Sequence, residues 1–241
     1  MITFIGTGHI FDLSEPMMFI IKQIWPDAVL VELDESRYTA MTSADSGERS
    51  RRGYADVPWI YRSTAKYQDR MSKEYGSSNV GSEMLTAVNT GKLVGAKIGF
   101  IDSDAGNVMR EVWNEMSRRE RLRYSISTLR DRISGKKEIE KTVDDFSRNE
   151  EEMIADMRKK YPTLVAKLID ERNEHMAGQI RKYISECKNM VVVVGDAHVE
   201  GLSSYFKEFE VRKIRLADLL DRDKMDAVRS ALWNRDEKDE S

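Results

Sequence analysis

Residues 190–198 read Met-Val-Val-Val-Val-Gly-Asp-Ala-His, and this stretch decides the fold class. A short apolar run rich in β-branched residues and ended by a turn residue is typical of a β-strand. Four similar runs are found at Ile2–Ile5, Ala28–Leu33, Lys97–Ile101 and Val211–Leu216. The segments between the runs are long enough for crossover helices, which connect parallel strands. The sequence therefore predicts an α/β fold with a single, largely parallel sheet flanked by helices.

Two of the connecting segments have helical spacing of their apolar residues, namely Leu13–Trp25 and Arg62–Tyr75. Between them, residues 42–53 (TSADSGERSRRG) combine Ser, Gly and like charges, which is typical of a mobile segment. We expect a lid or a processing loop there.

The stretch before the fourth strand predicts a long helical insertion, at about 105–187. It contains almost no Gly, a single Pro, and many Glu, Lys, Arg, Met and Leu residues, which favours three long helices. Basic residues gather at 118–137 and acidic residues at 138–152, so we expect a hairpin whose faces attract. Solvated helix faces with weak surface pairs explain the same pattern. A partner-binding arm, here a homodimer, and an anionic membrane surface are the other interpretations.

Length and composition restrict the class of protein. The 241 residues suit one domain over 1–241, with a polar tail at about 234–241. A formal net charge of −3 gives no excess of basic residues that would indicate nucleic-acid binding. The lone Cys187 rules out an internal disulfide and thiolate-rich zinc sites. There is no basic leader and no apolar run long enough for a membrane span, so we expect a cytoplasmic protein.

Two of the three histidines follow a strand in the same Gly-x-x-His context. These are His9, in Gly6-Thr-Gly-His, and His198, in Gly195-Asp-Ala-His. Residues just beyond the carboxyl ends of parallel strands face one common crevice, so both imidazoles are expected in it. The third, His175, lies on the last predicted helix of the insertion and is expected to be dispensable, with a ligand role as the alternative.

Carboxylates gather at the same edge of the predicted sheet. Glu32 and Asp34 fall inside or just past the second strand, where a charge needs a partner or a metal. Asp102 and Asp104 end the third strand, and capping of the next helix is the alternative role for them. Glu83 opens a helix, where the helix dipole alone favours an acid. Glu171 and its neighbours lie on a long helix, where surface pairing is the plain expectation.

Ordered blocks of this sequence resemble the TraB/PrgY domain family, and more distantly the Tiki metalloproteases and the erythromycin esterase and ChaN-like group. The blocks are GTGH at 6–9, VELDESR at 31–37, GSEM at 81–84, the acidic end of the third strand at 102–104, ERNEHMA at 171–177 and VVVGDAH at 192–198. The resemblance implies a metal-associated hydrolase-like fold, known as a metal-dependent peptidase in Tiki and as a suppressor of a peptide pheromone in PrgY. The chain departs from the family where Ser103, in place of Arg, follows Asp102, and where the polar RDEKDES ends a chain whose relatives often carry membrane helices.

On this basis, the predicted function is hydrolysis of peptides by a divalent cation, Mn²⁺, Co²⁺ or Zn²⁺. The predicted ligands are His9, Glu32 and His198. The candidate catalytic residues are Glu83 as general base, Arg172 as the oxyanion or carboxylate partner, and Glu171 and Asp34. A module that binds a peptide or an anion in the same cleft without turnover is the alternative.

Overall fold

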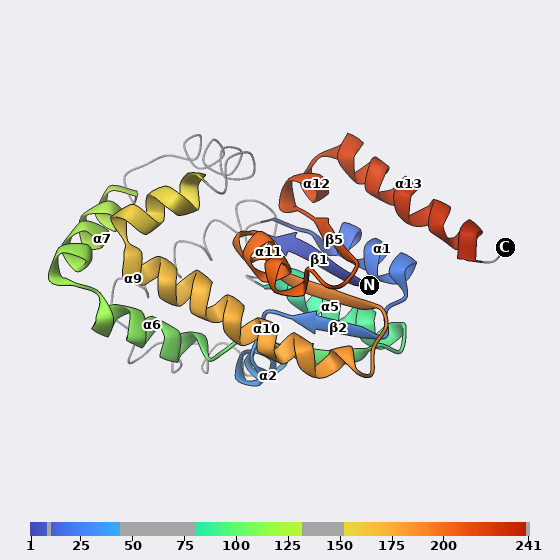
Figure 1. Ribbon diagram of the computed structural model, residues 1–241, viewed down its shortest axis with the longest axis horizontal. Coiled ribbons are helices and arrows are strands. Elements are labelled where there is room, and N and C mark those ends of the chain that lie inside the picture. The colour runs from blue at the N-terminus through green and yellow to red at the C-terminus, as the bar shows by residue number, and fades with distance from the viewer. Residues whose placement is uncertain (9–10, 44–80, 132–151, 240–241) are drawn as a thin grey trace.

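The computed structural model describes residues 1–8, 11–43, 81–131 and 152–239, and it contains a five-stranded, all-parallel sheet (Figure 1). The strand order is β3-β2-β4-β1-β5. The strands are β1 (Ile2–Thr7), β2 (Ala28–Val31), β3 (Lys97–Phe100), β4 (Met190–Gly195) and β5 (Val211–Ile214). The predicted α/β fold with a parallel sheet is confirmed.

Strand β4 is the centre of the sheet, with β1 on one side and β2 on the other. Ile2 to Thr7 pair in register with Met190 to Gly195, and Ala28 to Val31 pair with Met190 to Val193. Val191 to Val194 are completely buried, because helices cover both faces of this strand. Successive valines alternate between two apolar clusters, one on each face, as the period of a strand requires.

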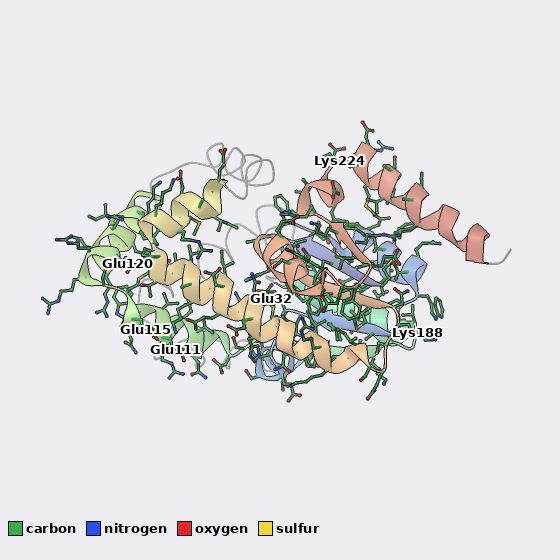
Figure 2. The ribbon with its side chains drawn as sticks, viewed as in Figure 1. Glu32, Glu111, Glu115, Glu120, Lys188 and Lys224 are labelled. Carbon is green, nitrogen blue, oxygen red and sulfur yellow. The ribbon has the colours of Figure 1, made fainter. Side chains whose placement is uncertain are left out.

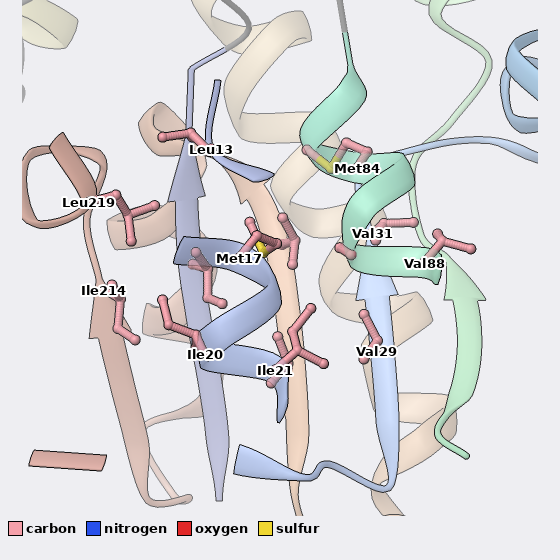
Figure 3. Packing of buried hydrophobic residues seen from close by; sticks show 14 of the residues in the cluster. Leu13, Met17, Ile20, Ile21, Val29, Val31, Met84, Val88, Ile214 and Leu219 are labelled. Carbon is pink, nitrogen blue, oxygen red and sulfur yellow. The ribbon is translucent and has the colours of Figure 1, made fainter. Parts of the chain in front are cut away.

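The first face is covered by α1 (Ser14–Ile24) and α5 (Ser82–Leu93), which pack on the sheet through Met17, Ile20, Met84 and Val88 (Figure 3). The helices α12 (Leu216–Leu220) and α13 (Arg222–Asp239) complete this side. The segment at 234–239, predicted as a polar tail, is the end of α13.

The second face is covered by α10 (Glu171–Ile184), α11 (Asp196–Ser203) and the short 3₁₀ turn Ser204–Phe206. A stripe of Met176, Ala177 and Ile180 faces the sheet from α10. The spacing of these residues, i, i+1 and i+4, is that of an amphipathic helix.

The described part of the insertion that precedes α10 lies to one side of the sheet (Figure 1). It comprises α6 (Ala105–Glu115), α7 (Arg118–Asp131), a helical segment at 152–160, α9 (Pro162–Val165) and the π-helical segment Ala166–Asp170 that leads into α10. A small core around Val112, Met116 and Leu164 holds these helices together. On α7, the apolar side chain of Leu122 is 64% exposed. The homodimer predicted to form through this insertion stays a prediction.

The structure differs from the predicted elements at several ends. Three predicted strands are shorter, since β2 ends at Val31, β3 at Phe100 and β5 at Ile214. The short helix α2 (Glu35–Thr42) begins soon after β2. The predicted helix at 62–75, nearly all of the segment at 42–53 and most of the acidic run at 138–152 lie outside the described residues. None of the helices in the described ranges combines the length and apolar composition that a bilayer crossing requires.

Candidate functional site

The carboxyl ends of β2 and β4 bring Glu32 and His198 together. Glu32 follows β2 directly, and His198 lies in the first turn of α11, three residues after the end of β4. Oε1 of Glu32 is 3.6 Å from Nε2 of His198. Both side chains are nearly buried, with residue exposures of 7% and 5%. Figure 2 places Glu32 between the sheet and α10.

Arg172 of α10 joins these residues to the end of β3. Its Nε and Nη2 donate to the two carboxylate oxygens of Asp102 at 3.0 and 2.8 Å. Nη2 also donates to Oε1 of Glu32, and Nη1 lies 3.3 Å from Nε2 of His198. A single guanidinium thus contacts residues carried by β2, β3 and α11, and we refer to Glu32, Asp102, Arg172 and His198 as the buried polar cluster.

The charge of Arg172 is fixed by its neighbours. Burial by itself lowers the pKa of this guanidinium, but the attraction of Glu32 and the bonds to Asp102 outweigh burial and raise the pKa above its usual range. Arg37 adds a longer contact, with Nη1 3.7 Å from Oδ2 of Asp102. Arg172 is therefore a permanent cation held between two carboxylates.

Backbone groups complete the bonding of the two carboxylates. Oε2 of Glu32 accepts from the amide N–H of Gly195 at 2.6 Å, which ties the end of β2 to the end of β4. Oδ1 of Asp102 accepts from the N–H of Ser103 at 2.8 Å. The helix that follows is capped by the other acid, since Oδ1 of Asp104 accepts from the N–H of Asn107.

The second nitrogen of His198 faces Asn173, the residue after Arg172. Nδ1 of His198 lies 2.8 Å from Oδ1 of Asn173, and Asn173 is 3% exposed. A π-helical segment, Ala166–Asp170, comes directly before α10, and Nη1 of Arg172 donates to the Leu168 carbonyl at 3.4 Å. Single π-turns of this kind are frequent at functional sites, because they change which residues of a helix face inward.

A polar cleft of about 230 Å³ opens beside the buried polar cluster, between α6 and α10. Arg172 is the member of the cluster that lines it. The other lining residues are Ser103, Asp104, Asn107, Val108, Glu111, Lys167, Glu171 and His175.

Of the remaining predicted site residues, Asp34, Glu83 and Glu171 lie in the described part of the chain, and His9 lies outside it. Asp34 caps α2, accepting from the N–H of Arg37 at 2.9 Å. Glu171 is exposed and pairs with Lys167 at 3.0 Å. Glu83, at the start of α5, is completely buried. His9 lies outside the described residues, although β1, which precedes it, is the neighbour of β4.

The described donors do not fit a divalent cation bound between Glu32 and His198. Both Oε1 of Glu32 and Nε2 of His198 contact the guanidinium of Arg172, so a dication there would lie against a fixed positive charge. Among the described ranges, no group of three or more His, Cys, Asp or Glu side chains could hold a metal ion. The chemistry proposed below therefore includes no step at a metal.

Asn173 and Asp196 were not among the predicted site residues. Asn173 occupies a buried position on the same helix as Met176, Ala177 and Ile180, and a polar residue in such a stripe is a signal that the sequence offers. Asp196 accepts from the Leu216 N–H at 2.8 Å and pairs with Arg215, so it joins α11 to the end of β5. No sequence signal separates this Asp from an ordinary helix-start acid.

Comparison with known proteins agrees with the family resemblance of the sequence motifs. The sequence matches the TraB/PrgY/gumN family over residues 1–217. It is 27% identical over 212 residues to the uncharacterized protein MJ1365 of Methanocaldococcus jannaschii, covering 86% of this chain. The alignment covers 53% of that relative, so the chain spans about half its length. No solved structure matches the chain. Because the family match extends over nearly all of the sequence, the chain belongs to the TraB/PrgY/gumN family.

Proposed function

We propose that this protein is a hydrolase of peptides whose reaction takes place at the carboxyl edge of the sheet, with His198 as the general base. The observation that carries the proposal is the pairing of Nε2 of His198 with Oε1 of Glu32 at 3.6 Å, on two adjacent strand ends. An imidazole beside a carboxylate is a recurring arrangement for taking a proton from water.

The cluster supplies what such a base requires. When Nε2 takes a proton from water, the imidazole becomes positively charged, and the carboxylate of Glu32 next to it offsets that charge. Asp102 keeps the guanidinium of Arg172 in place on the other side of Glu32. Glu32 therefore faces two cations, the guanidinium of Arg172 and the protonated imidazole of His198. Its other oxygen, Oε2, accepts from the Gly195 N–H.

Arg172 is the residue through which a substrate oxygen contacts the cluster. Arg172 is the one residue of the buried polar cluster that lines the cleft. The contacts of its Nη1, 3.3 Å to Nε2 of His198 and 3.4 Å to the Leu168 carbonyl, are longer than those of its Nε and Nη2. A carbonyl oxygen that replaces the Leu168 carbonyl on Nη1 gains a charged donor as it becomes an oxyanion.

The test compares turnover of a peptide library by the wild type with turnover by His198→Gln and Glu32→Gln. Loss of a general base typically costs about 10²–10⁴ in rate, and we expect a loss in that range for His198→Gln. Gln179→Ala is the matched control, because this amide lies on α10 and donates nothing to the cluster; its Oε1 accepts from Lys182. Full activity in His198→Gln would exclude His198 as the base.

Metal analysis of the same preparations tests the predicted cation. Protein purified without chelator and without metal-affinity resin is analysed for Mn, Co and Zn. We expect turnover that does not follow the metal content. Stoichiometric metal that disappears in His198→Gln would instead support the predicted ligand set of His9, Glu32 and His198.

Binding of a peptide without turnover is the second candidate, and the burial of the cluster favours it. His198 is 5% exposed and Glu32 7% exposed, so a substrate bond must come close to side chains that solvent barely reaches. Saturable binding of peptides, with no product after long incubation and no effect of His198→Gln, would favour this candidate.

A further inference from the structure

The two nitrogens of His198 are held by consecutive residues of one helix. Nη1 of Arg172 lies 3.3 Å from Nε2, and Oδ1 of Asn173 lies 2.8 Å from Nδ1. All three residues come from elements on the same face of the sheet, α10 and α11. The imidazole therefore has a donor-only group on one side and an amide on the other.

The chemistry of arginine decides which nitrogen of His198 carries the proton. A guanidinium can only donate hydrogen bonds, so Nε2, which faces it, must accept. A neutral imidazole that accepts at Nε2 has its proton on Nδ1, and Nδ1 then donates to Asn173. The orientation of the Asn173 amide agrees with this deduction, because its oxygen faces Nδ1.

We propose that Asn173 is a positioning residue that holds His198 as the Nδ1–H tautomer, with the lone pair of Nε2 directed at the guanidinium of Arg172. The proposal builds on the function proposed above, because the lone pair of Nε2 is what a general base uses. Nothing in Asn173 itself takes part in proton transfer, since an amide neither gains nor loses a proton near neutral pH.

The side-chain amide of Asn173 is closely packed by its neighbours. The residue is 3% exposed, and Gly201 of α11 lies so close that a Cβ at position 201 would overlap Nδ2 of Asn173. Close approach by a glycine prevents the amide from rotating away from the ring. A buried amide with both ends in contact is fixed in one orientation, which is what selection of one tautomer needs.

A carboxylate at position 173 would accept from Nδ1 in the same way. Asn173→Asp should therefore preserve the tautomer, because Asp has nearly the same shape and accepts hydrogen bonds. Asn173→Ala removes the acceptor, so the Nδ1 proton loses its partner. The pair of variants separates hydrogen bonding from simple packing, since Asp and Ala differ in what they offer Nδ1.

The experiment is ¹⁵N NMR of the imidazole side chains, recorded without substrate well above the ordinary histidine pKa of about 6.5. The chain contains three histidines, so assignment by single substitutions is practical. We expect His198 to show the Nδ1–H pattern in the wild type and in Asn173→Asp. In Asn173→Ala the ring loses the acceptor that holds it with Nε2 facing Arg172, so we expect the ring to turn away from Arg172 and the Nε2–H form to gain population. His175, which is exposed on the same helix, is the internal reference and should not change.

Two results would overturn the proposal: an Nε2–H pattern for His198 in the wild type, or an unchanged Nδ1–H pattern in Asn173→Ala. An Nε2–H pattern in the wild type overturns the proposal even if a variant fails to fold. Because tautomers are read without turnover, an Nδ1–H pattern that is lost in Asn173→Ala, in a protein that hydrolyses no peptide, would refute the proposed function and support the role of Asn173.

Discussion

The carboxylate of Asp196 occupies the space that a side chain at position 6 would need. A Cβ added to Gly6 would overlap Oδ1 of Asp196 and lie 3.1 Å from Val199. Through this contact the first Gly-x-x-His segment is packed against the second. Oδ1 of Asp196 also accepts from the N–H of Leu216 at 2.8 Å, so the same carboxylate reaches the end of β5. Three strand ends, those of β1, β4 and β5, meet at one side chain.

Gly6→Ala should therefore destabilise the fold by about 1–3 kcal/mol. The methyl group displaces Asp196, which is buried and would lose its bonds to Arg215 and Leu216. Urea denaturation of both proteins measures the change. The matched control is Gly178→Ala on α10, where a Cβ meets nothing within 4 Å, so the helix should gain about 0.5–1 kcal/mol. Equal stabilities for the two variants would contradict the packing argument.

Replacement of Arg172 should cost more than replacement of a surface arginine. In Arg172→Met, the carboxylates of Glu32 and Asp102 stay nearly buried without their shared cation, which costs about 3–5 kcal/mol. Denaturation of the variant measures it. Arg229→Met is the comparison, because its pair with Glu15 at 2.8 Å is exposed and contributes about 0–1 kcal/mol. A loss in Arg172→Met no larger than in Arg229→Met would show that the cluster adds little to stability.

Sequence reasoning located the strands well and their carboxyl ends less well. The apolar, β-branched runs predict correctly where strands begin, because the residues of a central strand are buried and must be apolar. The predicted end of β5 is two residues too late, because the Asp218 N–H donates to the backbone carbonyl of Arg215 at 2.9 Å and α12 starts at Leu216. The backbone N–H of Arg215 donates to Asp218 at 2.9 Å. Such local hydrogen bonding competes with an apolar pattern and is not visible in it.

For the site, several residues could be predicted from the sequence, but few of their partners could. Glu32, His198 and Arg172 are all candidates from the sequence, and in the structure Arg172 contacts His198 across 26 residues and Glu32 across 140 residues. Asp102 appeared in the sequence as an acid at the end of a strand, with helix capping as its alternative role. Its pairing with Arg172 across 70 residues depends on how α10 lies on the sheet, which no local pattern encodes.

Acidic pH should destabilise the helical insertion through protonation of Glu120. Oε1 and Oε2 of Glu120 accept from the N–H and the hydroxyl of Thr163, both at 2.9 Å, and these bonds join α7 to α9. Burial alone raises the pKa of Glu120, but the N–H donors of Thr163 and Ser117 outweigh burial, so the pKa is lowered. A lowered folded pKa gives stability that is present above the unfolded value, about 4.3, and lost as the pH falls through the folded value.

The measurement is denaturation of wild type and Glu120→Gln from neutral to acid pH. At neutral pH the wild type should be the more stable, since the amide replaces one charged acceptor by a donor that faces N–H groups. The difference should shrink below about pH 4.3 as Glu120 gains its proton. Glu115→Gln is the control, because Glu115 is exposed and pairs with Lys167 at 3.0 Å. A difference independent of pH would contradict the ionised role of Glu120.

Gly201→Ala offers a way to disturb His198 without replacing any residue of the buried polar cluster. The added methyl group would overlap Nδ2 of Asn173, so the amide must move away from the position in which Oδ1 contacts Nδ1 of His198. The stability should change little, because alanine favours a helix over glycine by about 0.5–1 kcal/mol and offsets part of the strain. We expect peptide hydrolysis to fall and the His198 tautomer to shift, with Gly178→Ala unchanged in both. A Gly201→Ala protein that matches the wild type in turnover and in its imidazole spectrum would mean that Asn173 can move freely, and that its contact with His198 does not set the tautomer.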